Sequence, residues 1–261
     1  MATAVLLGSG CRGASDRAAS DSAATDGAAT DGAASGPLVV MAAASLNRAM
    51  PELLRAFEAR ERVKGTLVLG ATGSLAAQLV NGAPADVFFS ADETTVDGLV
   101  AQGVLDGRTR ALFANGVLML VTRRGVDAPR VLTDLTAKRF TIVALANPDL
   151  APYGAAARQI MQSAGIWESL TGRLVFGENV AGTWQLVQSG NADAAFVAQS
   201  VVPDNADVGR LILDPSQHLP LRQAAAVVVS SRHPAARDFL HFVRGVDGQA
   251  ILRQHGFAPP Q

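Results

Sequence analysis

The feature that most constrains the fold is an alternation of short apolar runs with segments of helical spacing, which continues from residue 37 to the C-terminus. The first run, residues 38–44 (LVVMAAA), is continuous, as in a strand that is buried on both faces. The apolar residues that follow have the spacing of one helix face. They are Leu46, Ala49, Met50, Leu53, Leu54 and Phe57. This alternation predicts an α/β fold with mainly parallel sheets.

The same reading places the other elements along the chain. Strands are expected at residues 66–69, 86–90, 117–122, 141–145, 174–176, 194–198 and 225–230. Helices are expected from about residue 75, at 93–102, 155–164 and 181–188, and finally through Phe239 and Val243. Ser45 is expected to be the N-cap of the first helix. Pro51 either kinks that helix or marks its true first turn.

Charge and length exclude several classes of protein. The 261 residues include 22 Lys and Arg against 23 Asp and Glu, and this balance argues against a nucleic-acid-binding protein. Hydrophobic residues make up 49% of the chain, enough for the core of one large domain or of two small lobes. No stretch approaches the roughly 18 to 20 apolar residues that span a bilayer.

The first 36 residues differ from the rest. Residues 1–10 read MATAVLLGSG and precede Cys11, the only cysteine. This segment is either an Ala-rich start without a role or a truncated lipoprotein signal, residues 1–11, with Cys11 as the lipidated residue. Residues 12–36 carry almost only small and polar side chains, which cannot bury enough apolar area to offset chain ordering. We therefore expect a flexible linker there.

The motifs of an enzyme are missing from the sequence. It contains no G-x-S-x-G and no P-loop, and its GATGS segment is not a G-x-G-x-x-G fingerprint. One cysteine excludes an internal disulfide and a cysteine-based metal cluster, and the four histidines lack His-x-x-x-His spacing. We therefore predict no catalytic residues and no residues that bind a metal cation directly.

Small, uncharged residues occupy several expected strand-to-helix junctions, at residues 44–46, 71–74, 152–154 and 179–181. A helix N-terminus leaves backbone N–H groups unpaired and carries partial positive charge. Several such ends directed at one point would form an anion site without a cationic side chain. Taken singly, each junction is better explained by ordinary helix capping, and spacing alone does not establish that they converge.

Five segments occur in a specific order: AAASLNRAMPELLRAFE, GATGSLAAQLVNGAPADVFFSAD, ANPDLAPYGAAARQIM, GENVAGTWQLVQSGNADAAFVAQS and ILRQHGFAPP. With them the chain, from about Leu38 to its C-terminus, resembles the periplasmic molybdate-binding proteins of ABC importers. The resemblance implies a two-lobed, type II periplasmic-binding-protein fold with crossover strands between the lobes. Lobe 1 would comprise residues 37–116 plus 223–261, and lobe 2 residues 117–222.

The resemblance also implies a set of ligand-binding residues. Ser45 matches the family's binding serine after the first strand, and Thr72 falls on the second binding serine, with Ser74 a weaker candidate. Tyr153 occupies a ligand-contacting position, and Val180 matches a backbone N–H donor. Some members carry a binding tyrosine where this chain has Ala198, and Tyr153, its only tyrosine, would supply that hydroxyl instead.

The function implied is that of an extracytoplasmic receptor. It would bind molybdate or tungstate, with the metal held inside the oxyanion and no cofactor, and would deliver it to an ABC permease. We expect a monomer in the periplasm or on the outer face of the cytoplasmic membrane, where Cys11 would provide a lipid anchor. The alternatives are a receptor for another small oxyanion or solute, and an enzyme on the same two-lobed scaffold.

Overall fold

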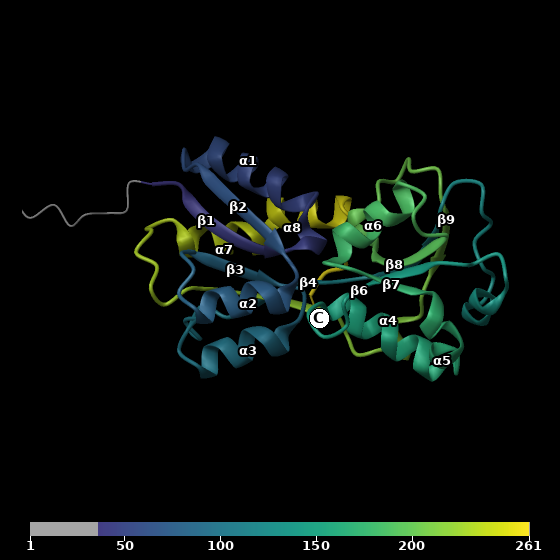
Figure 1. Ribbon diagram of the computed structural model, residues 1–261. Coiled ribbons are helices and arrows are strands. Elements are labelled where there is room, and N and C mark those ends of the chain that lie inside the picture. The colour runs from purple at the N-terminus through teal and green to yellow at the C-terminus, as the bar shows by residue number, and fades with distance from the viewer. Residues whose placement is uncertain (1–35, 261) are drawn as a thin grey trace, which may run out of the picture. The chain divides into compact units, whose positions relative to one another are not determined.

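The computed structural model describes residues 36–260, which fall within one compact unit, Ala33–Gln261. The predicted lipoprotein signal, the lipidation of Cys11 and all but the last residue of the predicted linker lie outside these residues. Two five-stranded sheets organise the described chain (Figure 1). Helices alternate with strands in both, so the predicted α/β class is confirmed.

The first sheet has the strand order β2-β1-β3-β10-β4. Strands β1, β2 and β3 are parallel, and β10 runs antiparallel to both β3 and β4. The strands span Leu38–Ala43 (β1), Gly65–Gly70 (β2), Val87–Ser90 (β3), Ala111–Asn115 (β4) and Arg222–Val227 (β10). Because β1 is buried almost throughout, its sequence is a continuous apolar run.

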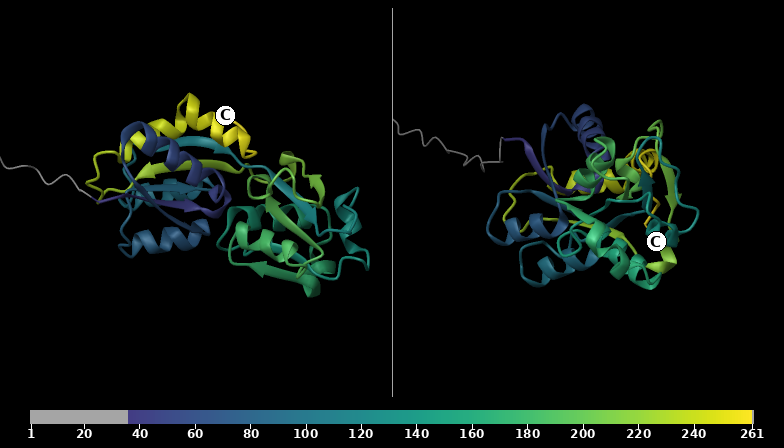
Figure 2. Two further views of the ribbon diagram at one scale, coloured as in Figure 1. Left: turned by 90° about the horizontal axis from the view of Figure 1, so that it is seen from above. Right: turned by 45° about the vertical axis from the view of Figure 1, so that its right-hand side comes forward.

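Helices cover both faces of this sheet (Figure 2). They span Ala49–Glu61 (α1), Thr72–Val80 (α2), Glu93–Ala101 (α3), Ala236–Arg244 (α7) and Val246–Gln254 (α8). Helices α1, α7 and α8 close one core cluster, in which the rings of Phe57 and Phe239 meet edge to face at 5.1 Å between centroids. Helices α2 and α3 close a second cluster on the opposite face.

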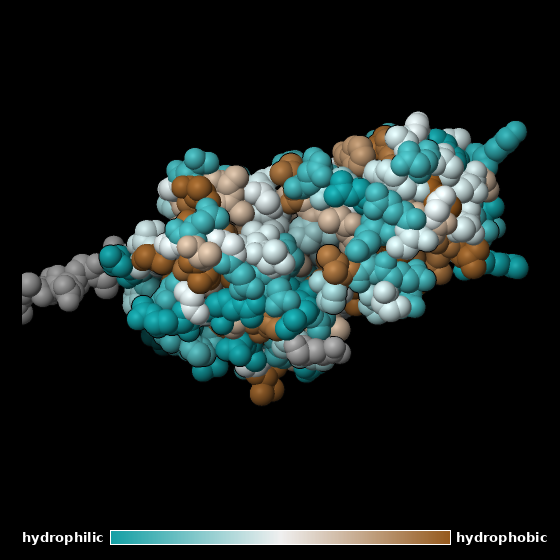
Figure 3. All heavy atoms as spheres, turned by 90° about the horizontal axis from the view of Figure 1, so that it is seen from below, coloured by the Kyte–Doolittle hydropathy of each residue, from teal (hydrophilic) through white to brown (hydrophobic). Residues whose placement is uncertain are grey.

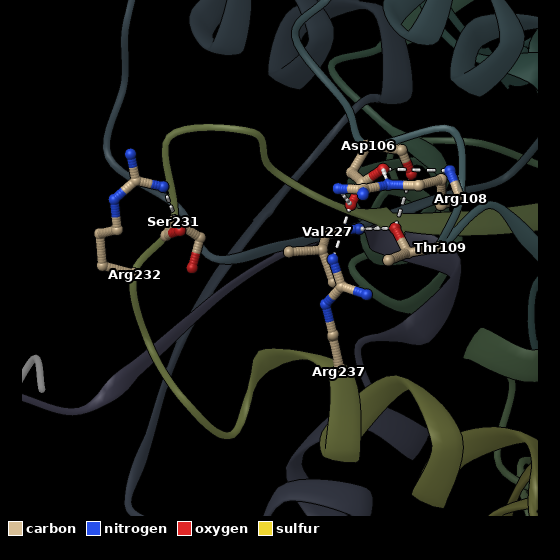
Figure 4. Close-up of polar contacts among 7 residues, drawn as sticks. All are labelled: Asp106, Arg108, Thr109, Val227, Ser231, Arg232 and Arg237. Carbon is tan, nitrogen blue, oxygen red and sulfur yellow. Dashed lines mark hydrogen bonds and ion pairs between the residues drawn. The ribbon is translucent and has the colours of Figure 1, made fainter.

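A polar network fastens α7 to the loop that follows α3 (Figure 4). The carboxylate of Asp106 accepts hydrogen bonds from the guanidinium groups of Arg108 and Arg237. The hydrogen bond from Arg108 holds the pKa of Asp106 below its ordinary value. Beside it, the Thr109 hydroxyl accepts from the N–H of Val227 at 2.9 Å. The returning C-terminal segment is thereby tied to the lobe that contains β1.

The second sheet has the order β7-β6-β8-β5-β9, with β6 parallel to both β7 and β8 and with β5 antiparallel to its neighbours. Its strands are Leu118–Thr122 (β5), Val143–Ala146 (β6), Leu174–Gly177 (β7), Ala194–Ala198 (β8) and Gly209–Ile212 (β9). The helices of this half are Pro152–Ser163 (α4), Trp167–Leu170 (α5) and Val180–Gln188 (α6).

The chain passes between the two sheets twice. It first crosses between β4 and β5 through Gly116 and Val117, and it returns between β9 and β10 through residues 213–221. The two crossings lie side by side, because the N–H of Gly116 donates to the carbonyl oxygen of Leu221 at 2.8 Å. The strands that flank each crossing therefore link the two sheets at one place.

The expected N-cap at Ser45 was wrong. Ser45 lies inside a 3₁₀ turn, Ala44–Leu46, that follows β1 directly, and α1 begins only at Ala49 with Arg48 in the cap position. Pro51 is the third residue of α1, where a missing N–H breaks no helical hydrogen bond. Of the two readings of Pro51, the first-turn position is the correct one.

Other differences concern two strands that were missed and the bounds of several elements. Strands β4 and β9 were not expected, and β10 begins three residues before the expected strand at 225–230. The single closing helix is in fact two, α7 and α8, which are separated by Gly245 in an extended conformation. Helix α4 begins at Pro152 rather than at residue 155, since proline suits the first helical position.

The α-helices between residues 36 and 260 have 13 residues or fewer. No helix within residues 36–260 is long and apolar enough to cross a bilayer. On the face shown in Figure 3, hydrophobic residues are scattered among hydrophilic ones and do not form one continuous patch. Isolated exposed apolar side chains of this kind are ordinary on a protein surface.

Candidate ligand-binding site

A small cavity lies where the strand-to-helix junctions of the two sheets face each other. It is narrow and partly open to solvent, and none of its lining residues is charged. The lining comes from the end of β1, the starts of α2, α4 and α6, and Ala91 after β3. Four of the predicted residues are brought together here, namely Ser45, Thr72, Tyr153 and Val180. Ser74 is half-buried and does not line this cavity.

Ser45 presents a buried hydroxyl that lies beside the phenol of Tyr153 but makes no well-formed hydrogen bond. Its side chain is 1% exposed, and within the described chain its Oγ makes no hydrogen bond. Its own carbonyl oxygen accepts a hydrogen bond from the hydroxyl of Ser200 at 2.7 Å, which fixes the peptide from the other sheet. A buried polar atom without a partner is costly, so a ligand that accepts its proton would remove this penalty.

Thr72 is the first residue of α2, and its hydroxyl is already oriented. The N–H of Ala91 donates to Thr72 Oγ1 at 3.1 Å, which leaves the hydroxyl proton for another acceptor. The preceding Ala71 has no side chain that caps the helix. The N–H of Gly73 instead donates across the two sheets to the carbonyl oxygen of Leu150, at 2.8 Å. The start of α2 is thus held against the segment that leads into α4.

Tyr153 is the second residue of α4 and is 2% exposed. Burial raises the pKa of its phenol, and the neighbouring side chains of Gln223 and Ser45 lower it by less. The side chain therefore stays neutral at physiological pH and remains able to donate. The Gln223 amide Nε2 lies 2.9 Å from the phenolic oxygen and donates to it.

The start of α6 contributes backbone groups. Asn179 is its N-cap, and the side-chain oxygen accepts from the N–H groups of Ala181 and Gly182 at 3.1 and 3.0 Å. Val180 borders the cavity and its N–H is not used by this cap. The partial positive charge of the helix N-terminus is therefore directed towards the cavity.

The site as a whole offers protons and no negative charge. Three hydroxyls and the N-termini of α2, α4 and α6 border one space that contains no carboxylate. Such a donor set suits a ligand that has acceptor atoms only, and helix N-termini bind anions without a cationic side chain. The junctions that spacing alone could not bring together do meet in the structure. The ligand contacts of the individual residues stay predictions.

Two residues beside this cavity were not anticipated. Ser200 fixes the peptide of Ser45, and Gln223 bonds to Tyr153. The one local signal was the polar Gln223 at the head of the apolar run AAAVVV, since a buried polar side chain in a strand needs a partner. Between residues 36 and 260 no cluster of three His, Cys, Asp or Glu side chains is arranged to hold a metal ion.

Comparisons with known proteins agree with this architecture. The family model described as "Bacterial extracellular solute-binding protein" matches residues 38–258. The molybdate-binding protein ModA of Azotobacter vinelandii is 30% identical over 225 residues, which are 84% of this chain and 88% of that protein. A putative ABC transporter substrate-binding lipoprotein, YvgL of Bacillus subtilis, is 25% identical over 84% of this chain and 85% of its own length.

A solved structure supports the same comparison. The periplasmic molybdate-binding protein of Azotobacter vinelandii superposes with a TM-score of 0.81 at 29% identity, covering 86% of this chain and all of that chain. The two-lobed type II fold with crossover strands, expected from the sequence, is thereby confirmed.

Proposed function

Because the chain belongs to the bacterial extracellular solute-binding protein family, we propose that it is the substrate-binding component of an ABC importer for molybdate or tungstate. Its relatives are substrate-binding proteins of transporters, so the chain is a receptor and not an enzyme. The ligand is held in the uncharged cavity between the two sheets, and the protein then delivers it to a membrane permease.

The observation that carries this proposal is the buried hydroxyl of Ser45, which makes no well-formed hydrogen bond, in a cavity whose lining holds hydroxyls and helix N-termini and no charged side chain. Molybdate and tungstate are tetrahedral dianions that carry no proton at neutral pH, so each of their oxygens can only accept. A carboxylate in the lining would repel them, and none is present there. Hydrogenphosphate needs an acceptor for its proton, which this donor set does not favour. Sulfate differs mainly in size, so a cavity of fixed size would discriminate against it.

Ser45, Thr72 and Tyr153 donate their hydroxyl protons to the oxyanion in this proposal, and Val180 donates its N–H. Ser74 remains a weaker candidate, because it lies beyond the cavity lining. Closure brings lobe 1, residues 37–116 and 223–261, against lobe 2, residues 117–222. Hinge closure around a ligand is a common mechanism in two-lobed receptors, and the paired crossings provide the hinge.

The proposed location is outside the cytoplasmic membrane. We propose Cys11 as a lipid attachment site, which is in keeping with the Bacillus subtilis relative that is described as a lipoprotein. The change Cys11→Ser should release the full chain from the membrane fraction of a host that processes lipoproteins. Unchanged fractionation would contradict the anchor and would leave the proposed ligand unaffected.

Calorimetry on the purified protein tests the ligand. We expect molybdate and tungstate to bind at least about a hundredfold more tightly than sulfate or phosphate, a difference of about 2.7 kcal/mol. Ser45→Ala serves as the matched variant, because it removes one hydroxyl and leaves the remaining donors in place. Tightest binding of phosphate would indicate another oxyanion receptor, and absence of binding to all four anions would overturn the proposal.

A further inference from the structure

The hydroxyl of Tyr153 lies against both crossings between the sheets. From one side, Gln223 Nε2 donates to it at 2.9 Å. The other crossing approaches so closely that a Cβ on Gly116 would overlap the phenolic oxygen, and it would also lie 2.9 Å from Gln223 Nε2. Gly116 is the first residue of one crossing, and Gln223 is the second residue of the strand that ends the other.

The fold supplies a reason why Gln223 points at Tyr153. Gln223 is fully buried, and the register of β10 against β4 shifts between Gln223 and Ala224. A bulge of this kind turns the side chains next to it away from the regular alternation of a strand. The amide thus reaches a phenol that belongs to a helix of the other sheet.

The direction of this hydrogen bond decides what Tyr153 can do. Because the amide N–H donates, it occupies an acceptor position on the phenolic oxygen and leaves the phenolic proton for another partner. Tyr153 borders the cavity, so that proton is available to a ligand there. A side chain at position 223 that could only accept would reverse the direction of the hydrogen bond. Tyr153 would then donate its phenolic proton to residue 223 and not to the ligand.

We propose that Gln223 is a positioning residue that keeps the Tyr153 hydroxyl a donor towards the bound oxyanion, and that Gly116 provides the space for it. This inference rests on the proposed function for its ligand. Because Gln223 keeps the Tyr153 hydroxyl a donor, the site favours ligands whose atoms there can only accept hydrogen bonds. Neither Gln223 nor Gly116 is among the residues that border the cavity, so each acts through Tyr153.

A measurement without ligand tests the direction of the hydrogen bond between Gln223 and Tyr153. Tyr153 is the only tyrosine, so tyrosine labelled with ¹³C at Cζ gives one NMR signal that reports on this hydroxyl. In Gln223→Glu, the ionised carboxylate accepts the phenolic proton, whereas the protonated acid donates to the phenol as the amide does. Burial raises the pKa of a carboxyl group, so we expect one titration step between pH 5.5 and 8.5 in this variant and none in the wild type.

Molybdate affinity provides the second readout. At pH 8.5 the affinity of Gln223→Glu should be lower by at least about tenfold, as for a lost hydrogen bond to a charged ligand. It should recover towards pH 5.5, where molybdate keeps its charge, while the wild-type affinity stays level. In a Tyr153→Phe background the pH dependence should vanish, because no phenolic proton remains to be redirected.

Gly116→Ala tests the need for space, with Gly98→Ala as the matched control, since a Cβ at Gly98 meets no atom within 4 Å. Displacement of Tyr153 should lower the affinity of Gly116→Ala about tenfold. Adding Tyr153→Phe to Gly116→Ala should then lower the molybdate affinity little further. The control should bind like the wild type.

The outcomes separate the two proposals. A Tyr153 signal that does not titrate in Gln223→Glu, or molybdate binding that is level with pH in that variant, would overturn the positioning role. If the wild-type protein binds no oxyanion while the Tyr153 signal of Gln223→Glu still titrates, the proposed function is overturned. The direction of the hydrogen bond from Gln223 to Tyr153 is then retained.

Discussion

The hydroxyl of Ser200 donates to the carbonyl oxygen of Ser45 at 2.7 Å, although the two residues are 155 positions apart and follow strands of different sheets. The guanidinium group of Arg48 adds a contact of the same kind, since it donates to the carbonyl oxygens of Ser200 and Val202. The peptide that carries one cavity hydroxyl is therefore fixed by the opposite lobe. In the proposed closure of the lobes, the same contact would orient Ser45.

Ser200→Ala should weaken molybdate binding without a large change in folding. One neutral hydrogen bond contributes about 1 kcal/mol, so we expect affinity to fall about three- to tenfold. Ser189→Ala is the matched control, because this exposed serine bonds only to its near neighbours in sequence, Leu186 and Asn191. Calorimetry on the three proteins decides the matter, and equal affinities would show that the link between the lobes does not support binding.

Ser45→Ala should separate binding from stability. Removing its hydroxyl should cost about 1.5 to 3 kcal/mol of binding free energy, as for a hydrogen bond to a charged partner. The ligand-free protein should be as stable as the wild type or more stable, because Ser45 is not a helix cap and its buried hydroxyl makes no well-formed hydrogen bond. Thermal melts with and without molybdate measure both effects. A loss of stability with unchanged binding would refute the ligand role.

Thr72→Val should differ from Ser45→Ala because the Thr72 hydroxyl has a structural partner. The N–H of Ala91 would lose its acceptor, and an unsatisfied buried group costs about 1 to 3 kcal/mol. We expect both the free energy of unfolding and the molybdate affinity to fall. Thr72→Ser keeps the hydroxyl and should preserve both. If the valine variant bound molybdate as the wild type does, the hydroxyl would serve the fold alone.

The fold was predictable because buried strands have a direct signature. Residues 38–43 and 194–198 are continuous apolar runs, and both are strands in the structure. Strand β9 was not predicted, since it has four residues and its side chains alternate between half-buried and exposed. Ser45 was misplaced as a cap because spacing cannot distinguish a 3₁₀ turn from the first turn of a helix.

The sequence predicted those residues of the site that can be recognised from their immediate neighbours in the chain. Ser45, Thr72, Tyr153 and Val180 each follow a strand, and the structure places them around one cavity, while their ligand contacts stay predictions. The partners of these residues are distant in sequence. Gln223 is 70 positions from Tyr153, so no local pattern could pair the two, and only the crossing of β10 into the first sheet brings them together.

Asp193 should make stability depend on acid pH. Burial alone would raise the pKa of this carboxyl, but hydrogen bonds from Thr141, Arg123 and the N–H of Ile142 outweigh it and lower the pKa to about 2. A pKa that is lower in the folded state stabilises the fold above the unfolded value of about 3.9. We expect roughly 2 kcal/mol from this group at pH 7, lost as the pH falls from about 5 to 2.

Asp193→Asn tests this effect against Asp207→Asn, in which an exposed ion pair with Arg124 is removed. The Asp193 variant should unfold at lower urea concentration at pH 7, and its free energy of unfolding should fall less steeply between pH 5 and 2 than that of the wild type. The Asp207 variant should follow the wild type, because an exposed pair contributes little. Molybdate affinity at pH 7 should be unchanged in both, since neither residue borders the cavity. Parallel acid profiles for Asp193→Asn and the wild type would show that this carboxylate does not stabilise the second sheet.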